Sequence, residues 1–343
     1  MKAIGIILAG GNNNRMKELT AKRAVPALPV AGSFRAIDFS LSSMSNSHIQ
    51  TVAILTQYNA RSLNEHLSSS KWWNFGRKQG GLFLFTPTVT ADNSDWYRGT
   101  ADAMYQNIDF LKRRHEPYVI ISSGDCVYKL DFNRVLDFHI EKKSDITVVC
   151  KDMMYNDDVS RFGVVRMDDE SRITEFDEKP IEALSNTIST GIYVIRRRQL
   201  IELLEAAAEE NRFDFVNDIL VRYKNVKKIY GYKINSYWNN IADIDAYFKT
   251  NMDFLRPDVR SYFFREEPTI CSKVDDLPPA KFNPGSDISN SLVSSGCIIN
   301  GRVEDSVLFK QVFVGKNTTV KNCVILNDVY IGDNVHLENC IVE

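Results

Sequence analysis

Two adjacent glycines and an arginine form the first group of residues that could bind a phosphate. Gly10 and Gly11 directly follow an apolar run at residues 4–8, and Arg15 comes shortly after them. Backbone N–H groups at a glycine turn can approach phosphate oxygens closely, and a guanidinium adds a charged fork. The spacing is neither a P-loop nor a dinucleotide-binding fingerprint. A tight strand-to-helix turn is the alternative interpretation.

The elements that would hold this turn are short strands rich in Ile and Val. They are apolar at successive positions, which is typical of a sheet that is covered on both faces. Amphipathic stretches between them predict helices, so the alternation predicts an α/β domain with a mostly parallel, Rossmann-like sheet over residues 1–255. The predicted strands lie at residues 4–8, 52–56, 118–122 and 146–150.

Three stretches have the spacing of helices. Thr100 is placed to cap a helix on which Met104, Ile108 and Leu111 share one face. Leucines at 200–204 mark a second helix, and Ile244, Phe248, Met252 and Leu255 mark a third.

The last part of the chain differs in character. Residues 256–287 hold five of the ten prolines and predict a linker with little regular structure. Beyond it, Val303, Val320 and Leu337 begin similar segments in steps of 17 residues. This repeat is typical of a left-handed parallel β-helix of hexapeptides over residues 288–343, with Gly or Asn at corners that need positive φ. An ordinary small β-sheet is the alternative. The last coil has no capping segment in this sequence, so we expect the domain to help assemble an oligomer.

Composition excludes several classes of protein. The 343 residues carry 42 basic and 44 acidic side chains, a net charge of -2, so no nucleic-acid partner is expected. No apolar run reaches about 18 residues, and no membrane span is expected. The six cysteines form no Cys-x-x-Cys pair. This predicts a reduced, cytoplasmic protein without a zinc site.

Six ordered motifs, followed by the hexapeptide repeat, resemble the bacterial glucose-1-phosphate adenylyltransferases, also called ADP-glucose pyrophosphorylases. The resemblance covers essentially the whole chain. It implies a GT-A-like nucleotidyltransferase fold and a reaction in which ATP and glucose 1-phosphate give ADP-glucose and diphosphate with Mg²⁺. The motifs are Leu8-Ala9-Gly10-Gly11, Phe34-Arg35-Ala36-Ile37-Asp38-Phe39, Trp96-Tyr97-Arg98-Gly99-Thr100-Ala101-Asp102, Ser123-Gly124-Asp125 with Tyr128-Lys129, Glu178-Lys179-Pro180, and Thr190-Gly191-Ile192-Tyr193.

The resemblance also implies roles for individual residues. Asp125 would be one of two carboxylates on Mg²⁺, Lys179 would hold the sugar phosphate, Glu178 would contact a sugar hydroxyl, and Ser189 and Thr190 would lie near the glucose ring. Purely structural interpretations are the alternatives. Asp125 would be an ordinary aspartate at a strand end, Glu178 and Lys179 would form a surface turn before Pro180, and Trp96 and Tyr97 would be core aromatics. The nucleotide side would consist of Gly10, Gly11, Arg15, Gly99 and Thr100.

Four departures from the family pattern fall on the nucleotide and metal side. Asn12-Asn13-Asn14 replaces a glycine-containing stretch, and Val25 replaces a lysine. Thr88-Val89-Thr90 replaces a Gln-Gln-Arg-like stretch. Asn240 occupies the position of the second metal carboxylate, and an amide does not balance the charge of a cation. Asp243 could substitute for it, but it more plausibly caps the helix that follows.

These departures resemble the GlgD-type subunits of the family, which have little activity alone. The resemblance implies a regulatory subunit of glycogen biosynthesis that modulates a catalytic GlgC-type partner in a heterotetramer. Two alternatives remain: an active enzyme with an altered Mg²⁺ site, and a sugar-phosphate-binding sensor outside any enzyme complex.

Overall fold

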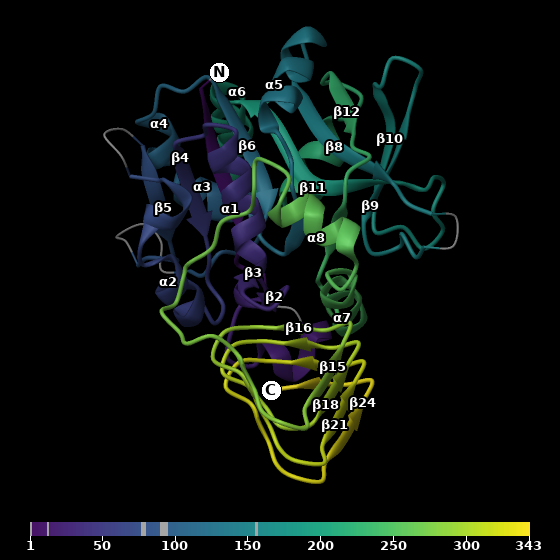
Figure 1. Ribbon diagram of the computed structural model, residues 1–343. Helices are drawn as coiled ribbons and strands as arrows, with labels where there is room; N and C mark the ends of the chain where they lie inside the picture. The colour runs from purple at the N-terminus through teal and green to yellow at the C-terminus, as the bar shows by residue number, and fades with distance from the viewer. Residues whose placement is uncertain (1, 12–13, 77–79, 90–94, 155–156) are drawn as a thin grey trace.

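The computed structural model describes residues 2–11, 14–76, 80–89, 95–154 and 157–343 (Figure 1). Strands and helices alternate through the first part of the chain, and the predicted α/β class is confirmed. The central sheet is formed by β1 (Ala3–Leu8), β4 (Thr51–Leu55), β5 (Gly81–Phe85), β6 (Tyr118–Ser123), β8 (Ile146–Asp152), β9 (Gly163–Met167), β10 (Ile173–Glu178), β11 (Thr187–Arg196) and β12 (Ile229–Lys233).

The strand order places β1 in the middle of the sheet. Strands β6, β1, β4 and β5 lie side by side and run parallel. Strand β11 runs antiparallel to β6 and β8, and β9 and β10 form an antiparallel hairpin at the edge. The sheet is therefore mixed, and its parallel half holds the turn after β1.

Helices cover both faces of the sheet. Ala3 and Ile7 of β1 pack into the core under α1 and α5, and Ile4 and Ile6 pack into the core under α3, α4 and α6. This two-sided burial explains why β1 is apolar at successive positions. The helices are α1 (Ala36–Asn46), α2 (Arg61–Leu67), α3 (Thr100–Gln106), α4 (Ile108–Lys112), α5 (Phe132–Glu141), α6 (Arg197–Glu209), α7 (Ile244–Asp253) and α8 (Pro257–Phe264).

The C-terminal part forms the predicted parallel β-helix, with three sheets (Figure 1). Val303 pairs with Val320, and Val320 with Leu337, so the 17-residue echo is the register of successive coils. The first sheet has β14 (Lys281–Phe282), β17 (Ile298–Ile299), β20 (Phe313–Val314) and β23 (Tyr330–Ile331). The second has β15 (Asp287–Ser289), β18 (Arg302–Glu304), β21 (Thr319–Lys321) and β24 (His336–Glu338). The third has β16 (Leu292–Val293), β19 (Val307–Leu308), β22 (Val324–Ile325) and β25 (Ile341–Val342).

The corners of the β-helix have the predicted chemistry. Asn317 and Asn334 have φ of 55° and 59°, and Asn322 and Asn339 have φ of 49° and 52°. Asparagine tolerates this left-handed region better than most residues. A Cβ at Gly315 would lie 2.4 Å from the carbonyl oxygen of the next coil, so this glycine permits the close approach of two coils.

The proline-rich segment differs from its prediction. Pro257–Phe264 form α8, with Pro257 in the first turn. Proline is favourable there because its fixed φ suits a helix and its missing N–H would have no intrahelical partner. Strand β14 already belongs to the β-helix and pairs with β17, before the predicted start at residue 288.

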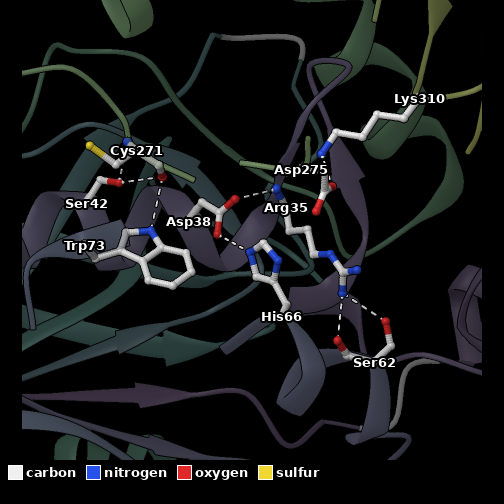
Figure 2. A network of polar contacts seen from close by, with 9 residues as sticks. All are labelled: Arg35, Asp38, Ser42, Ser62, His66, Trp73, Cys271, Asp275 and Lys310. Atoms are coloured by element: carbon white, nitrogen blue, oxygen red, sulfur yellow. Dashed lines mark hydrogen bonds and ion pairs between the residues drawn. The ribbon is translucent and has the colours of Figure 1, made fainter. Parts of the chain in front are cut away.

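Polar contacts tie the remaining segment to both domains (Figure 2). The backbone N–H of Cys271 donates to Ser42 Oγ of α1 at 2.9 Å, and Trp73 Nε1 donates to the Cys271 carbonyl at 3.1 Å. Further along, Asp275 pairs with Lys310 of the β-helix at 2.7 Å. The segment thus crosses from α1 to the β-helix and is held at both ends, at Cys271 and at Asp275.

Within the described residues, no helix combines the length and the apolar composition that crossing a bilayer requires.

Candidate functional site

The carboxyl ends of β1 and β6 form the floor of the candidate site. Leu8 of β1 is in register with Ser123 of β6, and the N–H of Gly124 donates to the Leu8 carbonyl at 2.9 Å. The turn with Gly10 after β1 and Asp125 after β6 therefore lie at one edge of the sheet. This edge is where open α/β sheets bind their ligands.

A first cavity of about 420 Å³ lies over this edge. Among the residues that the structure describes, none has a heavy atom within 4 Å of a Cβ placed on Gly11, so the backbone there leaves room for a ligand. Asn12 and Asn13 of the same loop lie outside the described residues. The cavity is lined by Gly10, Gly11, Gly99 and Thr100, which are the residues predicted for the nucleotide side apart from Arg15, and by Asp125, which was predicted as a metal carboxylate.

Val25 lies on the wall of the first cavity. It begins a 3₁₀ turn (Val25–Ala27) and is 4% exposed. Its side chain packs into the core that α1, α7, α8 and the β-helix share. The position where the family pattern has a lysine is therefore apolar and buried, and it adds no charge to the cavity.

Gly99 and Thr100 have structural roles at this wall. A Cβ on Gly99 would lie 2.3 Å from the Phe213 carbonyl oxygen, so only glycine fits. The prediction that Thr100 caps the helix is wrong: Gly99 is the N-cap residue, and Thr100 is the first residue of α3. The Thr100 hydroxyl instead accepts from the N–H of Phe215 at 2.8 Å. The predicted helix is also interrupted at Asn107, between α3 and α4.

The two aromatic residues before Gly99 differ in exposure. Tyr97 is buried, and its backbone exchanges hydrogen bonds with the Gln57 side chain at 2.9 and 3.1 Å. Trp96 is 62% exposed and stacks on Tyr58, another residue of the cavity wall. The core interpretation therefore holds for Tyr97 and is wrong for Trp96.

A second cavity of about 380 Å³ adjoins the first. Ser123 and Asp125 line both cavities, so Asp125 lies at their junction. The second cavity is lined by the predicted sugar-side residues Glu178, Lys179, Ser189 and Thr190, together with Asn240 and Arg15. Arg15, predicted for the nucleotide side, thus lies on the wall of the second cavity.

Glu178 and Lys179 end the β9–β10 hairpin, where Gly163 pairs with Glu178. Lys179 has φ of 51°, and its ammonium lies 3.3 Å from the Glu178 carboxylate. Burial raises the pKa of Glu178, an effect that Lys179 opposes and the Asp214 charge adds to. The pair places one cation and one acceptor at the mouth of the second cavity.

Two hydroxyls of β11 line the same cavity. Ser189 Oγ donates to Tyr193 Oη at 3.3 Å and is within reach of a ligand, because it lines the wall. Thr190 Oγ1 donates to the Val149 carbonyl at 2.9 Å. The hydroxyl proton of Thr190 is therefore used in a hydrogen bond to the backbone of β8.

Asn240 lies beside Asp125, because β13 (Trp238–Asn240) pairs with β7 (Cys126–Tyr128). The Asn240 amide donates to Cys126 Sγ at 3.4 Å, and its Oδ1 accepts from the N–H of Ala242 at 3.1 Å. Cys126 Sγ lies 3.5 Å from Asp125 Oδ1. Burial, with a further contribution from the Asp125 charge, raises the pKa of the Cys126 thiol well above its usual value.

These contacts do not fit a Mg²⁺ site with two carboxylates. Magnesium prefers octahedral oxygen ligands and takes one or two carboxylates from a protein. Asp125 supplies one carboxylate, which also accepts from Ser123 Oγ. The side-chain carbonyl of Asn240 accepts from the backbone N–H of Ala242 and carries no negative charge. In the described part of the chain, no group of three His, Cys, Asp or Glu side chains is arranged to hold a metal.

The sequence analysis missed Arg161 on the wall of the second cavity. Its guanidinium forms an ion pair with Asp243, which caps α7 as expected by accepting from the N–H of Ala246 at 2.7 Å. The β9–β10 hairpin could have predicted its position, because a residue just before β9 must lie near the residues that end β10. No feature of the sequence predicts that Arg161 pairs with Asp243.

Two family models match the chain. A model described as "Nucleotidyl transferase" matches residues 4–256, and one described as "GlmU-like, C-terminal hexapeptide" matches residues 278–343.

Three similar proteins are named glucose-1-phosphate adenylyltransferase. A glucose-1-phosphate adenylyltransferase of Clostridium novyi (strain NT) is 38% identical over 92% of this chain and 84% of its own length. One of Bacillus subtilis (strain 168) is 38% identical over 93% and 84%. One of Pseudothermotoga lettingae is 39% identical over 93% and 76%.

Proposed function

The chain belongs to the family of glucose-1-phosphate adenylyltransferases, and from this premise we propose that it is a GlgD-type regulatory subunit of such an enzyme. It would have little activity alone, and it would modulate a catalytic GlgC-type partner within a heterotetramer. Its pathway would be glycogen biosynthesis.

The reaction of the family makes clear which charges matter. A sugar phosphate attacks the α-phosphorus of ATP in line, and the protein contributes positioning and charge neutralisation. Mg²⁺ held by carboxylates supplies part of that neutralisation in the catalytic members. A subunit that has lost the groups for this task while keeping the fold would bind ligands better than it turns them over.

The arrangement of Asn240 is the observation that carries the proposal. Its Oδ1 accepts from the N–H of Ala242 and its amide donates to Cys126 Sγ, so both ends of the side chain are engaged within the protein. The Oδ1 keeps a second lone pair, but a neutral amide does not balance the charge of a cation, as the second carboxylate of the family pattern would. The loss of one metal carboxylate is expected to slow such a reaction by about 10²- to 10³-fold.

Val25 supports the same conclusion from the other cavity. A lysine at this position would bring a cation to the cavity wall, whereas Val25 is apolar and almost fully buried. The nucleotide and metal side thus lacks two charges that the family pattern has.

The sugar side keeps its polar groups, and this gives regulation a physical basis. Glu178, Lys179 and Ser189 still line the second cavity. A ligand that binds one state of an oligomer more tightly shifts the equilibrium by that difference in affinity. Sugar phosphate bound here would in this way change the affinity or rate of the catalytic partner.

The test is to purify the chain alone, the catalytic partner alone, and the two co-expressed. The proposal predicts that the lone chain forms ADP-glucose about 100-fold or more slowly than the partner. It also predicts that the two chains co-elute and that the mixture differs from the partner alone in KM or kcat. A lone chain with a partner-like rate, or two chains that never associate, would refute it.

One observation favours the alternative of an active enzyme. Asp125 lies at the junction of two adjoining cavities, so one carboxylate that could hold a metal is in place beside both. The same purification distinguishes the two functions, because an active enzyme needs no partner for turnover.

A further inference from the structure

Arg161 lies on the wall of the second cavity and forms an ion pair with Asp243, which lies outside that lining. Their side chains are 24% and 25% exposed, so both charges are largely withdrawn from water. Arg161 also lines a neighbouring cavity of about 640 Å³, and Asp243 lies on that side. The Arg161 side chain thus lies between the second cavity and the neighbouring cavity. Its ion pair with Asp243 is on the side of the neighbouring cavity.

Arg161 still has an unused donor. Its Nε is buried and has no hydrogen-bond acceptor among the residues that the structure describes. A buried N–H without an acceptor is costly, and it needs an explanation where a protein retains one. An anion in the second cavity would reach this donor only when the guanidinium turns away from Asp243.

The lining of the second cavity carries charges of both signs. The described residues of its lining include three cations, Arg15, Arg161 and Lys179, and two carboxylates, Asp125 and Glu178. The lining alone therefore carries a charge of +1 (three minus two). Three carboxylates outside the lining act on these groups: Asp243 pairs with Arg161, and Asp158 and Asp214 act through their charge on Arg161 and Glu178.

The electrostatic surroundings of Arg161 also favour the binding of an anion. Burial lowers the pKa of its guanidinium, Asp158 opposes this effect, and the nearby charge of Arg15 adds to it. A partly desolvated cation close to a second cation is a site where an added anion gains more than it would at an exposed arginine.

We propose that Asp243 competes with a bound phosphate for Arg161, so that this ion pair sets the affinity of the second cavity for phosphate monoesters. The proposal rests on the proposed function, in which this cavity binds a sugar phosphate. Arg161 is then a residue that determines affinity for the phosphate, and Asp243 is a positioning residue that draws the guanidinium toward α7.

The experiment is a double-mutant cycle on the full chain, read by isothermal titration calorimetry with glucose 1-phosphate and with inorganic phosphate. Asp243→Asn removes the charge and keeps a side chain that caps helices well. It is expected to tighten binding about tenfold, and Arg161→Gln to weaken it about tenfold. In the double variant, the removal of Asp243 should bring no gain, because there is no guanidinium to release.

Three controls separate this mechanism from a structural effect. Asp245→Asn removes a carboxylate from the same helix that lines the neighbouring cavity but not the second one, and it should change neither affinity. Arg161→Lys should recover part of the phosphate affinity. Thermal unfolding should show that Asp243→Asn leaves α7 folded.

The outcomes distinguish this proposal from the proposed function. Equal phosphate affinity in the wild-type chain and Asp243→Asn, or a tenfold gain that persists without Arg161, would overturn the role of the ion pair. Absence of phosphate binding in both the wild type and Asp243→Asn would also overturn it. The regulatory function is judged separately, by the rate of the catalytic partner with and without this chain.

Discussion

The side-chain amide of Asn240 donates to the Sγ of Cys126 at 3.4 Å, and the same sulfur lies 3.5 Å from Asp125 Oδ1. A raised thiol pKa keeps Cys126 protonated at neutral pH, so the thiol can donate to Asp125 while it accepts from Asn240. Two positions that would both be carboxylates in a catalytic site are here linked through a neutral thiol.

Asn240→Asp tests what this link replaces. The substitution adds a second carboxylate beside Asp125, which is the arrangement that Mg²⁺ prefers. We expect the rate of ADP-glucose formation by the lone chain to rise about tenfold or more in Mg²⁺. Val25 still leaves one cation missing, so the rate should stay below that of a catalytic relative.

Asn239→Asp is the matched control. Asn239 lies one residue earlier on β13, and its amide donates to Thr250 of α7 at 2.7 Å. Its substitution adds the same charge but directs it away from Asp125, so no gain in rate is expected. A gain with both variants would show that Asn240 has no special relation to a metal.

The sequence predicts the relation between Gly10 and Asp125 well, because both follow buried parallel strands. The register of Leu8 with Ser123 then brings them to one edge. The 17-residue echo likewise fixes the pairing of Val303 with Val320. In both cases a local pattern determines the geometry.

Other features of the site depend on contacts between segments that are distant in the sequence, and no sequence pattern predicts these contacts. Arg161 and Asp243 meet because the segment just before β9 and the start of α7 border the same neighbouring cavity. Thr100 has the chemistry of a cap, but a close approach to Phe213 requires glycine at position 99 and shifts the N-cap there. Tertiary contacts override the local preference of the sequence at such positions.

A second prediction concerns Asp38 in the first turn of α1 (Figure 2). One carboxylate oxygen accepts from the N–H of Arg35 at 2.8 Å, and the other lies 2.6 Å from His66 Nε2. Asp38 and His66 are both buried. Asp38→Ala leaves the buried His66 and the partly buried N–H of Arg35 without their acceptor and should lower the free energy of unfolding by about 3 kcal/mol.

Tryptophan fluorescence in urea can measure this change, because Trp73 packs edge-on to His66. Asp109→Ala serves as the control, since the Asp109 side chain is 76% exposed and its contact with Arg113 is 4.0 Å long. That variant should stay within about 0.5 kcal/mol of the wild type. Equal effects of the two substitutions would contradict the role given to Asp38.

A third prediction uses two glycines at equivalent positions of successive coils. A Cβ on Gly315 would lie 2.4 Å from the Gly332 carbonyl oxygen, whereas a Cβ on Gly332 would meet nothing within 4 Å. Gly315→Ala should therefore destabilise the β-helix by about 1–3 kcal/mol, and Gly332→Ala should be nearly neutral. Hydrogen exchange of peptides from residues 300–343 reports on this domain directly.

The last prediction concerns the pH dependence of ligand binding through Glu178. Burial, with an added effect of Asp214, raises the pKa of this carboxyl above its ordinary value, although Lys179 opposes the shift. A group with a raised pKa in the folded protein binds its proton more tightly there, so its charged form is lost at a higher pH than in the unfolded chain. If the carboxylate accepts a hydrogen bond from a sugar hydroxyl, the affinity for glucose 1-phosphate should fall as the pH drops toward 5.

Glu178→Gln separates this effect from the titration of the ligand itself. The phosphate monoester also gains a proton near pH 6, so the informative quantity is the ratio of wild-type to variant affinity at each pH. That ratio should be greatest near pH 7 and decline as Glu178 is protonated, with a midpoint above the ordinary glutamate value. A ratio that stays constant from pH 7 to pH 4 would show that the Glu178 carboxylate does not contact the sugar, and the second cavity would then recognise the phosphate alone.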